Sequence, residues 1–150
     1  MQGMSYWQRL HALGIYSLER RRDRYTILYT YKVILEIAPN FDDDRFKIKT
    51  VHNVRRGLLC IVPPINTVAT MRIKTIVEHS FAIRAPRLFN CVPKSIRSNN
   101  LSYEAFKSGL DKFLDKVPDL PSLTNYAQRA ASNSLSDQVV QLKRDGVYFM

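Results

Sequence analysis

One long helical stretch, from Ser17 to just before Pro39, constrains the fold of this chain more than any other part of the sequence. A serine at position 17 favours a helix start because its hydroxyl accepts a hydrogen bond from the free N–H groups of the first turn. Proline cannot continue the helical hydrogen-bond ladder, so Pro39 marks the end. A shorter helix with apolar residues three positions apart precedes it. We expect a tight break at Gly14 and a first helix that folds back on the second.

Two apolar stripes run along different sides of the long helix. The first stripe consists of Leu18, Tyr25, Leu28, Tyr29 and Leu35, and the second of Ile27, Tyr31, Ile34 and Ala38. Two stripes predict contacts on two sides. Either this is a central helix wrapped by the rest of the chain, or it also docks on a partner.

Short apolar runs in the middle of the chain predict a small antiparallel sheet with a basic outer face. The expected strands are Arg45–Val51, Leu58–Val62, Met71–Val77 and Ser80–Arg84. Pro86 suits the first position of a short helix that ends before Pro93. The fold class that follows is α+β and helix-dominated.

The clearest amphipathic pattern of the chain starts at Ser102 and runs to Val117, which predicts a C-terminal amphipathic helix. On its solvated face we expect Lys107 to pair with Asp111 one turn on. Together with the N-terminal helix pair and the sheet, this helix completes one compact domain over residues 1–120. Residues 121–150 are expected to form a weakly structured helical tail that is partly disordered or packs as a cap.

Catalytic and metal-binding patterns are missing from the sequence, so we expect no enzyme activity, no metal and no cofactor. The three histidines lack metal-ligand spacing, and no Gly-rich phosphate loop or nucleophile motif occurs. Phe41-Asp42-Asp43-Asp44 formally matches the aromatic-x-Asp-Asp pattern of polymerase palms, but it follows a helix exit and predicts an acidic surface loop. Cys60 and Cys91 are far apart in apolar surroundings, which indicates buried reduced thiols.

Targeting signals are also missing. Residues 1–14 lack the apolar run of a signal peptide, and Lys32 and Glu36 interrupt the longest apolar stretch, which is too short to span a membrane. We therefore expect an intracellular protein of the nucleus or cytoplasm that makes no membrane contact.

Basic residues carry the functional signal. Lys and Arg number 23 against 13 acidic residues, a net charge of +10 that favours polyanionic partners. Guanidinium groups clustered at a helix start oppose the helix dipole, a cost that an anionic partner would offset. The alternative is a solvated shell in which Arg22 pairs with Glu19 or Asp23. The candidate phosphate-binding residues are Arg20, Arg21, Arg22, Arg24, Arg56, Arg84, Arg87, Lys94 and Arg97.

Helical spacing divides the first four of these arginines. Arg20 and Arg24 lie one turn apart on the side that also carries Tyr31, whereas Arg21 and Arg22 point elsewhere. Aromatic residues near them are expected to lie mostly in the core. The phosphate-binding hypothesis fails if these side chains are locked into internal carboxylate pairs and leave no contiguous positive surface.

A series of short motifs spans residues 5 to about 136 in one order. They are Tyr6-Trp7, Tyr16–Arg22 with Arg24-Tyr25, Pro39-Asn40, Arg56-Gly57, Ser80-Phe81, Arg84–Asn90, Pro93-Lys94, Phe106-Lys107 with Leu110-Asp111, Pro118-Asp119 and Asn133–Leu135. In these motifs the chain resembles the C-terminal region, downstream of the polymerase domain, of reverse transcriptases encoded by non-LTR (LINE-type) retrotransposons, especially jockey-like elements. It departs from the family at Glu36-Ile37, where Glu-Gly is usual.

This resemblance implies a noncatalytic module that helps to hold template RNA and target DNA during target-primed reverse transcription. It carries over no catalytic residue, and it implies the RNA or DNA backbone as partner, with the upstream polymerase domain as a second candidate partner. Two alternatives stay open. The chain is a protein-interaction or structural module that docks on a polymerase or an acidic partner, or it is a nonfunctional retroelement remnant.

Overall fold

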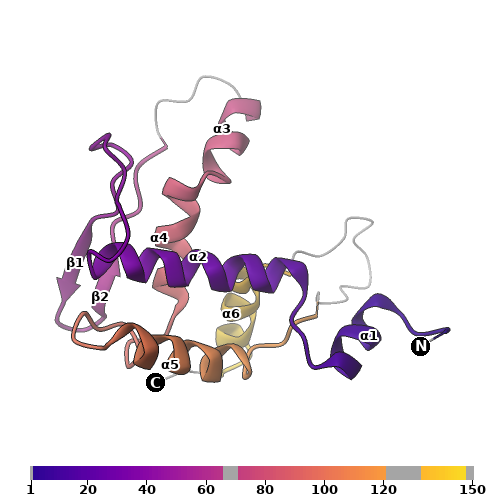
Figure 1. The fold of residues 1–150 in the computed structure, drawn as a ribbon. Helices are drawn as coiled ribbons and strands as arrows, with labels where there is room; N and C mark the ends of the chain where they lie inside the picture. The colour runs from indigo at the N-terminus through magenta and orange to yellow at the C-terminus, as the bar shows by residue number, and fades with distance from the viewer. Residues whose placement is uncertain (1, 66–70, 121–132, 148–150) are drawn as a thin grey trace.

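The computed structural model describes residues 2–65, 71–120 and 133–147, which hold six helices and one two-stranded antiparallel sheet (Figure 1). The predicted α+β, helix-dominated class is confirmed. In chain order the elements are α1 (Tyr6–Leu13), α2 (Leu18–Ile34), β1 (Thr50–Asn53), β2 (Gly57–Cys60), α3 (Met71–Glu78), α4 (Phe81–Cys91), α5 (Tyr103–Leu114) and α6 (Leu135–Arg144).

The N-terminal helix pair begins and breaks where the sequence predicts. Ser17 is the N-cap of α2, and its Oγ accepts a hydrogen bond from Arg20 N at 3.1 Å. Gly14 ends α1 in the left-handed conformation, with φ 62°. However, α1 lies beyond the N-terminal end of α2 instead of alongside it (Figure 1). Leu13 is 54% exposed, so the expected fold-back of α1 is wrong.

The C-terminal end of α2 comes about one turn before the predicted end at Pro39. Ile37 N donates to Lys32 O at 2.8 Å, and Glu36 N donates to Val33 O at 3.0 Å. These two bonds make a Schellman motif, whose left-handed residue is usually glycine. Here Glu36 takes that place with φ 59°, so the helix ends without a glycine.

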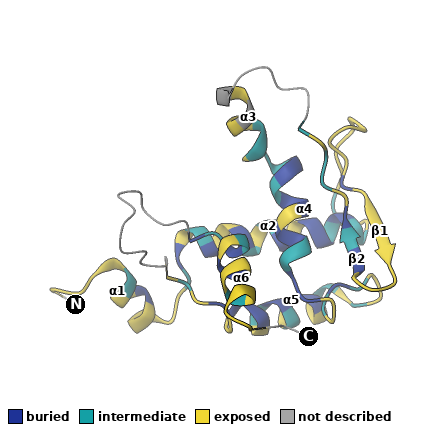
Figure 2. Cartoon of the chain, turned by 180° about the vertical axis from the view of Figure 1, so that it is seen from behind, coloured by how far each residue is buried: buried dark blue, intermediate teal, exposed yellow. Residues whose placement is uncertain are grey.

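The sheet is a single hairpin. Thr50 pairs with Cys60, and Asn53 pairs with Gly57 next to the turn. The Asn53 side chain accepts from the backbone N–H groups of Arg55 at 2.9 Å and Arg56 at 3.0 Å, which fixes the turn. The strand expected at Leu58–Val62 is confirmed for its first part, whereas the one at Arg45–Val51 overlaps β1 only at its end. All of β1 is exposed (Figure 2), and β2 packs against α4.

The other two expected strands, Met71–Val77 and Ser80–Arg84, are wrong, because these segments belong to α3 and to the start of α4. Pro86 lies in the middle of α4 and not at its first position. A proline inside a helix costs about 3 kcal/mol. Burial offsets that cost, since α4 packs against α2, β2 and α6 and its Ala85 and Phe89 have no exposed surface.

The core lies where α2, α4 and α5 meet. The rings of Tyr31 and Phe106 stack with centroids 3.8 Å apart, and Phe89 lies 6.1 Å from Phe106. Leu135 and Val139 of α6 are also buried in this core. Within the segment expected as a weakly structured tail, residues 133–147 thus pack on the domain as a cap. The rest of that segment, residues 121–132 and 148–150, lies outside the described residues.

Of the two stripes of α2, the second faces the core. Ile27 and Tyr31 have no exposed surface, whereas Leu18 and Tyr25 of the first stripe are more than half exposed. Leu28 of the first stripe is buried as well (4% exposed). The rest of the chain therefore covers the second stripe and part of the first, and leaves Leu18, Tyr25 and Tyr29 exposed.

Candidate nucleic-acid interface

Arg20 is a core residue and not a phosphate ligand. It has no exposed surface, and its guanidinium donates to the carbonyls of Val117 at 3.1 Å and Pro118 at 2.7 Å. Burial lowers the pKa of this guanidinium, and the nearby Asp119 partly opposes the effect. Arg20 thus joins the start of α2 to the residues that follow α5, and its assignment as a nucleic-acid contact is corrected.

Arg24 lies on the same side and bridges α2 to α5. Its Nε and Nη2 donate to the two oxygens of Asp111 at 2.6 and 2.9 Å. This bidentate hydrogen bond raises the pKa of Arg24. Because Asp111 is occupied in this way, it does not pair with Lys107, which lies 3.9 Å from Glu104 instead. The predicted pairing of Lys107 with Asp111 is wrong.

Arg84 of α4 takes part in a similar contact at the centre of the domain. Its Nη2 donates at 2.5 Å to Asp23, whose side chain is 2% exposed. The second oxygen of Asp23 accepts from the backbone N–H of Leu135 at 2.9 Å. Asp23 therefore pairs with Arg84, and not with Arg22 as one alternative held.

Arg97 is the second predicted ligand that lies in the interior. It is 8% exposed, and its guanidinium donates to the backbone carbonyls of Val92 at 2.6 Å, of Arg56 at 3.0 Å and of Leu58. Burial lowers its pKa. These bonds hold the hairpin against the segment after α4, so Arg97 positions the hairpin and is corrected from a phosphate contact to a structural residue.

The remaining five predicted residues, Arg21, Arg22, Arg56, Arg87 and Lys94, are exposed. Among the described residues, the ion pairs to carboxylates use Arg24, Arg45, Lys49, Arg84 and Lys107. Within the described residues, none of the five exposed cations is in one of these ion pairs.

Two of these cations meet at the tip of the hairpin. Arg56 lies in the turn next to the exposed Arg55, and the Lys94 ammonium donates to the carbonyls of Val54 at 3.3 Å and Arg55 at 3.2 Å. Gly57 has φ 73°, and a Cβ there would lie 3.0 Å from the Lys94 side chain. The lysine stem thus lies against a glycine, which brings three cations to one turn.

A cavity of about 700 Å³ between α2, α4 and α6 brings together Arg22, Arg84 and Arg87. Four carboxylates line the same cavity: Glu19, Asp23, Glu78 and Asp137. Burial, followed by the charge of Asp23, raises the pKa of Glu19. Because its four acidic groups outnumber its three arginines, this cavity is not a cationic site.

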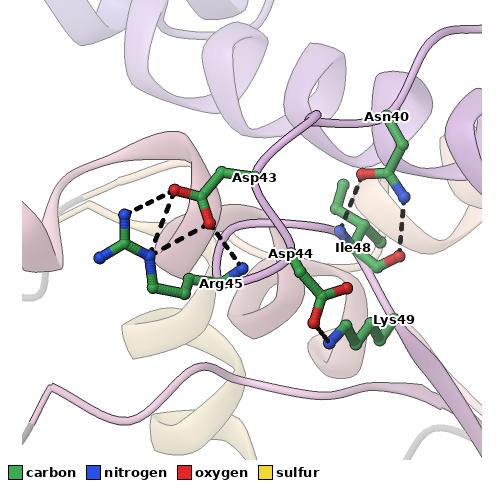
Figure 3. A network of polar contacts seen from close by, with 6 residues as sticks. All are labelled: Asn40, Asp43, Asp44, Arg45, Ile48 and Lys49. Atoms are coloured by element: carbon green, nitrogen blue, oxygen red, sulfur yellow. Dashed lines mark hydrogen bonds and ion pairs between the residues drawn. The ribbon is translucent and has the colours of Figure 1, made fainter.

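The acidic loop has its charge balanced locally (Figure 3). Arg45 donates to both oxygens of Asp43, with the shortest distance 2.7 Å, and Lys49 donates to Asp44 at 2.9 Å. Asn40 closes the loop, because its amide accepts from Ile48 N and donates to Ile48 O, each at 2.9 Å. The expected acidic surface loop is confirmed.

Two aromatic residues of α2 lie on the surface, against the expectation that aromatic residues near the arginines lie in the core. Tyr25 is 65% exposed and Tyr29 is 42% exposed. Their shared position could be seen in the sequence. Positions 18, 22, 25 and 29 are spaced three or four residues apart and therefore lie on one side of the helix. They lie on the same side as Arg21 and Arg22.

Reactive centres are not evident in the described ranges. No group of three His, Cys, Asp or Glu residues within them is placed to hold a metal ion. Burial raises the pKa of the Cys60 thiol to about 12 and that of Cys91 to about 11, so both stay protonated at neutral pH.

In the described part of the chain, no helix is both long and apolar enough to cross a membrane. Comparisons with known protein families, curated proteins and solved structures found no match.

Proposed function

We propose that this chain is a noncatalytic nucleic-acid-binding module from the C-terminal region of a non-LTR retrotransposon reverse transcriptase. The family part of the proposal rests on the sequence motifs between residues 5 and about 136. The role of the module is to hold the phosphate backbone of template RNA or target DNA while an upstream polymerase domain performs the chemistry. Binding of this kind depends little on sequence and weakens steeply with salt.

The observation that carries the proposal is the exposure of Arg21 and Arg22 near the start of α2. Both lie close to the positive end of the helix dipole, where cations are unfavourable. Arg20 and Arg24 have structural roles that explain their place in the sequence. Neither Arg21 nor Arg22 is in an ion pair within the described residues, although Arg22 also lines the cavity with the four carboxylates. A phosphate backbone would offset the unfavourable position of both side chains.

Fluorescence anisotropy with a labelled single-stranded RNA and a labelled DNA duplex tests this proposal. If several phosphate contacts form, the affinity of the wild-type protein falls roughly a thousandfold between about 50 and 200 mM salt. The double variant Arg21→Ala/Arg22→Ala should lower the slope of log K against log salt by about 1.8 on the duplex and about 1.4 on the single strand.

The matched control is Lys112→Ala/Lys116→Ala, which removes the same charge from exposed positions of α5 and the residues after it. If both double variants change the slope equally, binding reports net charge only and the site assignment is wrong. If the wild-type protein shows no salt-dependent binding, the proposed function is wrong.

A protein-docking function is the second candidate, and α3 favours it. Ile73 is 51% exposed and Ile76 is 65% exposed on this helix. Apolar residues in this arrangement suit contact with another domain, such as the polymerase domain. The variant Ile73→Asp/Ile76→Asp should then lose binding to the polymerase domain of a jockey-like reverse transcriptase and keep its RNA affinity. Ile27 is unsuitable for this test because it is fully buried.

A further inference from the structure

The outer face of α2 has an unusual composition for a solvent-exposed helix surface. Its five exposed residues are Leu18, Arg21, Arg22, Tyr25 and Tyr29. None of the five is acidic, and three of them are apolar or aromatic. An exposed helix face normally carries polar residues together with both positive and negative charges. This face therefore combines positive charge with aromatic surface.

Each of the two tyrosine rings has a neighbouring side chain beside it. Tyr29 contacts the Phe81 ring edge-to-face with centroids 5.6 Å apart, and its hydroxyl lies 3.4 Å from Pro39 O. The Arg24 guanidinium lies 5.8 Å from the centroid of the Tyr25 ring, and Asp111 fixes that guanidinium in turn. Rings that are already ordered lose little conformational entropy when a flat ligand stacks on them.

A cavity of about 310 Å³ continues this face at the C-terminal end of α2. Tyr29, Phe41 and Phe81 form its aromatic walls. Asn40 also lines it, but the Asn40 amide is already bonded to the backbone of Ile48 and Phe41. The cavity therefore offers ring surface and no free amide. This lining suits a flat aromatic base and does not select one base over another.

We infer that the outer face of α2 binds single-stranded nucleic acid, with bases stacked on Tyr25 and Tyr29 and with phosphates on Arg21 and Arg22. The inference rests on the proposed function and adds the strand type and the stacking residues. Proteins that bind single strands without sequence preference combine cationic side chains with aromatic stacking platforms in this way.

The exposed rings and the shape of this face argue against two other ligands, a nucleic-acid duplex and an acidic amphipathic helix. In a duplex the bases are paired and stacked, so their ring faces do not reach Tyr25 and Tyr29, and only the phosphates remain to be bound. An acidic amphipathic helix needs a hydrophobic groove, whereas the outer face is the convex side of one helix.

The test is fluorescence anisotropy of the full chain at low salt with labelled oligouridylate, with an RNA duplex of the same length and with an acidic amphipathic peptide. The key variant is Tyr25→Leu/Tyr29→Leu, which keeps apolar bulk and removes both rings. Each lost stacking contact should weaken single-strand binding about tenfold. Duplex binding should change by less than about twofold, because phosphate contacts do not use the rings.

Phe46→Leu is the matched control, because Phe46 is also exposed (41%) and has the Arg45 guanidinium 5.5 Å from its ring centroid. Phe46 belongs to the loop that carries Asp42, Asp43 and Asp44 and not to the outer face of α2, so single-strand affinity should stay unchanged. Thermal unfolding of all variants verifies that the fold is retained.

Each result has a clear meaning. If the tyrosine variant binds the single strand as tightly as the wild type while Arg21→Ala/Arg22→Ala weakens it, the stacking inference is wrong and the proposed function stands. If the wild-type protein binds neither nucleic acid, both are wrong. If the peptide alone binds and the tyrosine variant loses it, the outer face is a protein-docking surface and the inference is overturned.

Discussion

Asp23 of α2 and Arg84 of α4 form an ion pair at 2.5 Å in which the carboxylate is almost completely buried. The same carboxylate accepts a hydrogen bond from the first residue of α6, Leu135. One side chain therefore joins three helices that are distant in the sequence. A buried charge of this kind is tolerated only when its partners satisfy it.

Replacement of Asp23 by Asn should lower the free energy of unfolding by about 2 to 3 kcal/mol. The asparagine keeps the shape but leaves Arg84 without its counter-charge, and the partial exposure of Arg84 (34%) limits the loss. Urea denaturation measures the effect. Asp43→Asn is the control because it removes an exposed pair with Arg45, for which we expect a much smaller change. Equal effects of the two substitutions would contradict the structural role of Asp23.

Tyr31→Phe tests the hydrogen bonds that join the core to the loop before α5. The Tyr31 hydroxyl lies 2.6 Å from Ser98 O and 2.7 Å from Leu101 O, so the two carbonyls share its one proton, and its ring stacks on Phe106. The variant keeps the ring but leaves the carbonyls without this donor, so we expect a loss of about 1 to 2 kcal/mol in urea denaturation. Tyr25→Phe, on the exposed surface, should leave stability unchanged. If Tyr31→Phe leaves the free energy of unfolding unchanged, water replaces the hydroxyl.

Alkaline pH should destabilise the domain through its two thiols, of which Cys60 is buried and Cys91 is partly buried. The folded pKa of Cys60 is raised from 9.0 to about 12, so its contribution to stability is full below pH 9 and is lost as pH rises toward 12. Cys91 acts in the same direction, with a folded pKa of about 11. The double variant Cys60→Ala/Cys91→Ala should therefore show a flatter decline in the free energy of unfolding between about pH 9 and 10, before unfolded tyrosines titrate. Parallel curves for variant and wild type would contradict the burial of these thiols.

Glu36→Gly should stabilise the protein by about 1 kcal/mol. Glu36 holds the left-handed position of the Schellman motif with φ 59°, where a side chain is strained and glycine is not. The gain exceeds the extra entropy that glycine gives to the unfolded chain. Thermal unfolding measures the shift, and Glu36→Gln, which has the same backbone strain, should show none. Destabilisation by glycine would mean that the glutamate side chain stabilises the helix end.

The parts of the fold that the sequence predicts are those with strong local signals. Capping serines at Ser17 and Ser102 and the glycine at Gly14 mark helix boundaries because they satisfy backbone groups within a few residues. One error occurs where distant contacts overrule local preference. Pro86 disfavours a helix locally, but α4 gains enough burial against α2 and α6 to stay helical through the proline. The β-branched residues of α3 also disfavour a helix, and burial does not explain that error, since Ile73 and Ile76 are exposed.

The candidate site was predictable only in part. Helical spacing correctly grouped Arg20 with Arg24 and separated them from Arg21 and Arg22. Spacing does not reveal which group faces inward, because that depends on acceptors far along the chain, such as Val117 O and Asp111. The interior position of Arg97 has no local signal either, since its three acceptors are backbone carbonyls.

The alternation of inward and outward arginines on α2 has a consequence for any mutational scan of this helix. Changes at positions 20 and 24 should yield protein that is degraded or insoluble, while changes at 21 and 22 should yield well-behaved protein with a defect visible only in an assay with a ligand. A loss-of-function screen that does not monitor protein abundance would merge the two classes. Scored separately, the two phenotypes should alternate with the period of the helix.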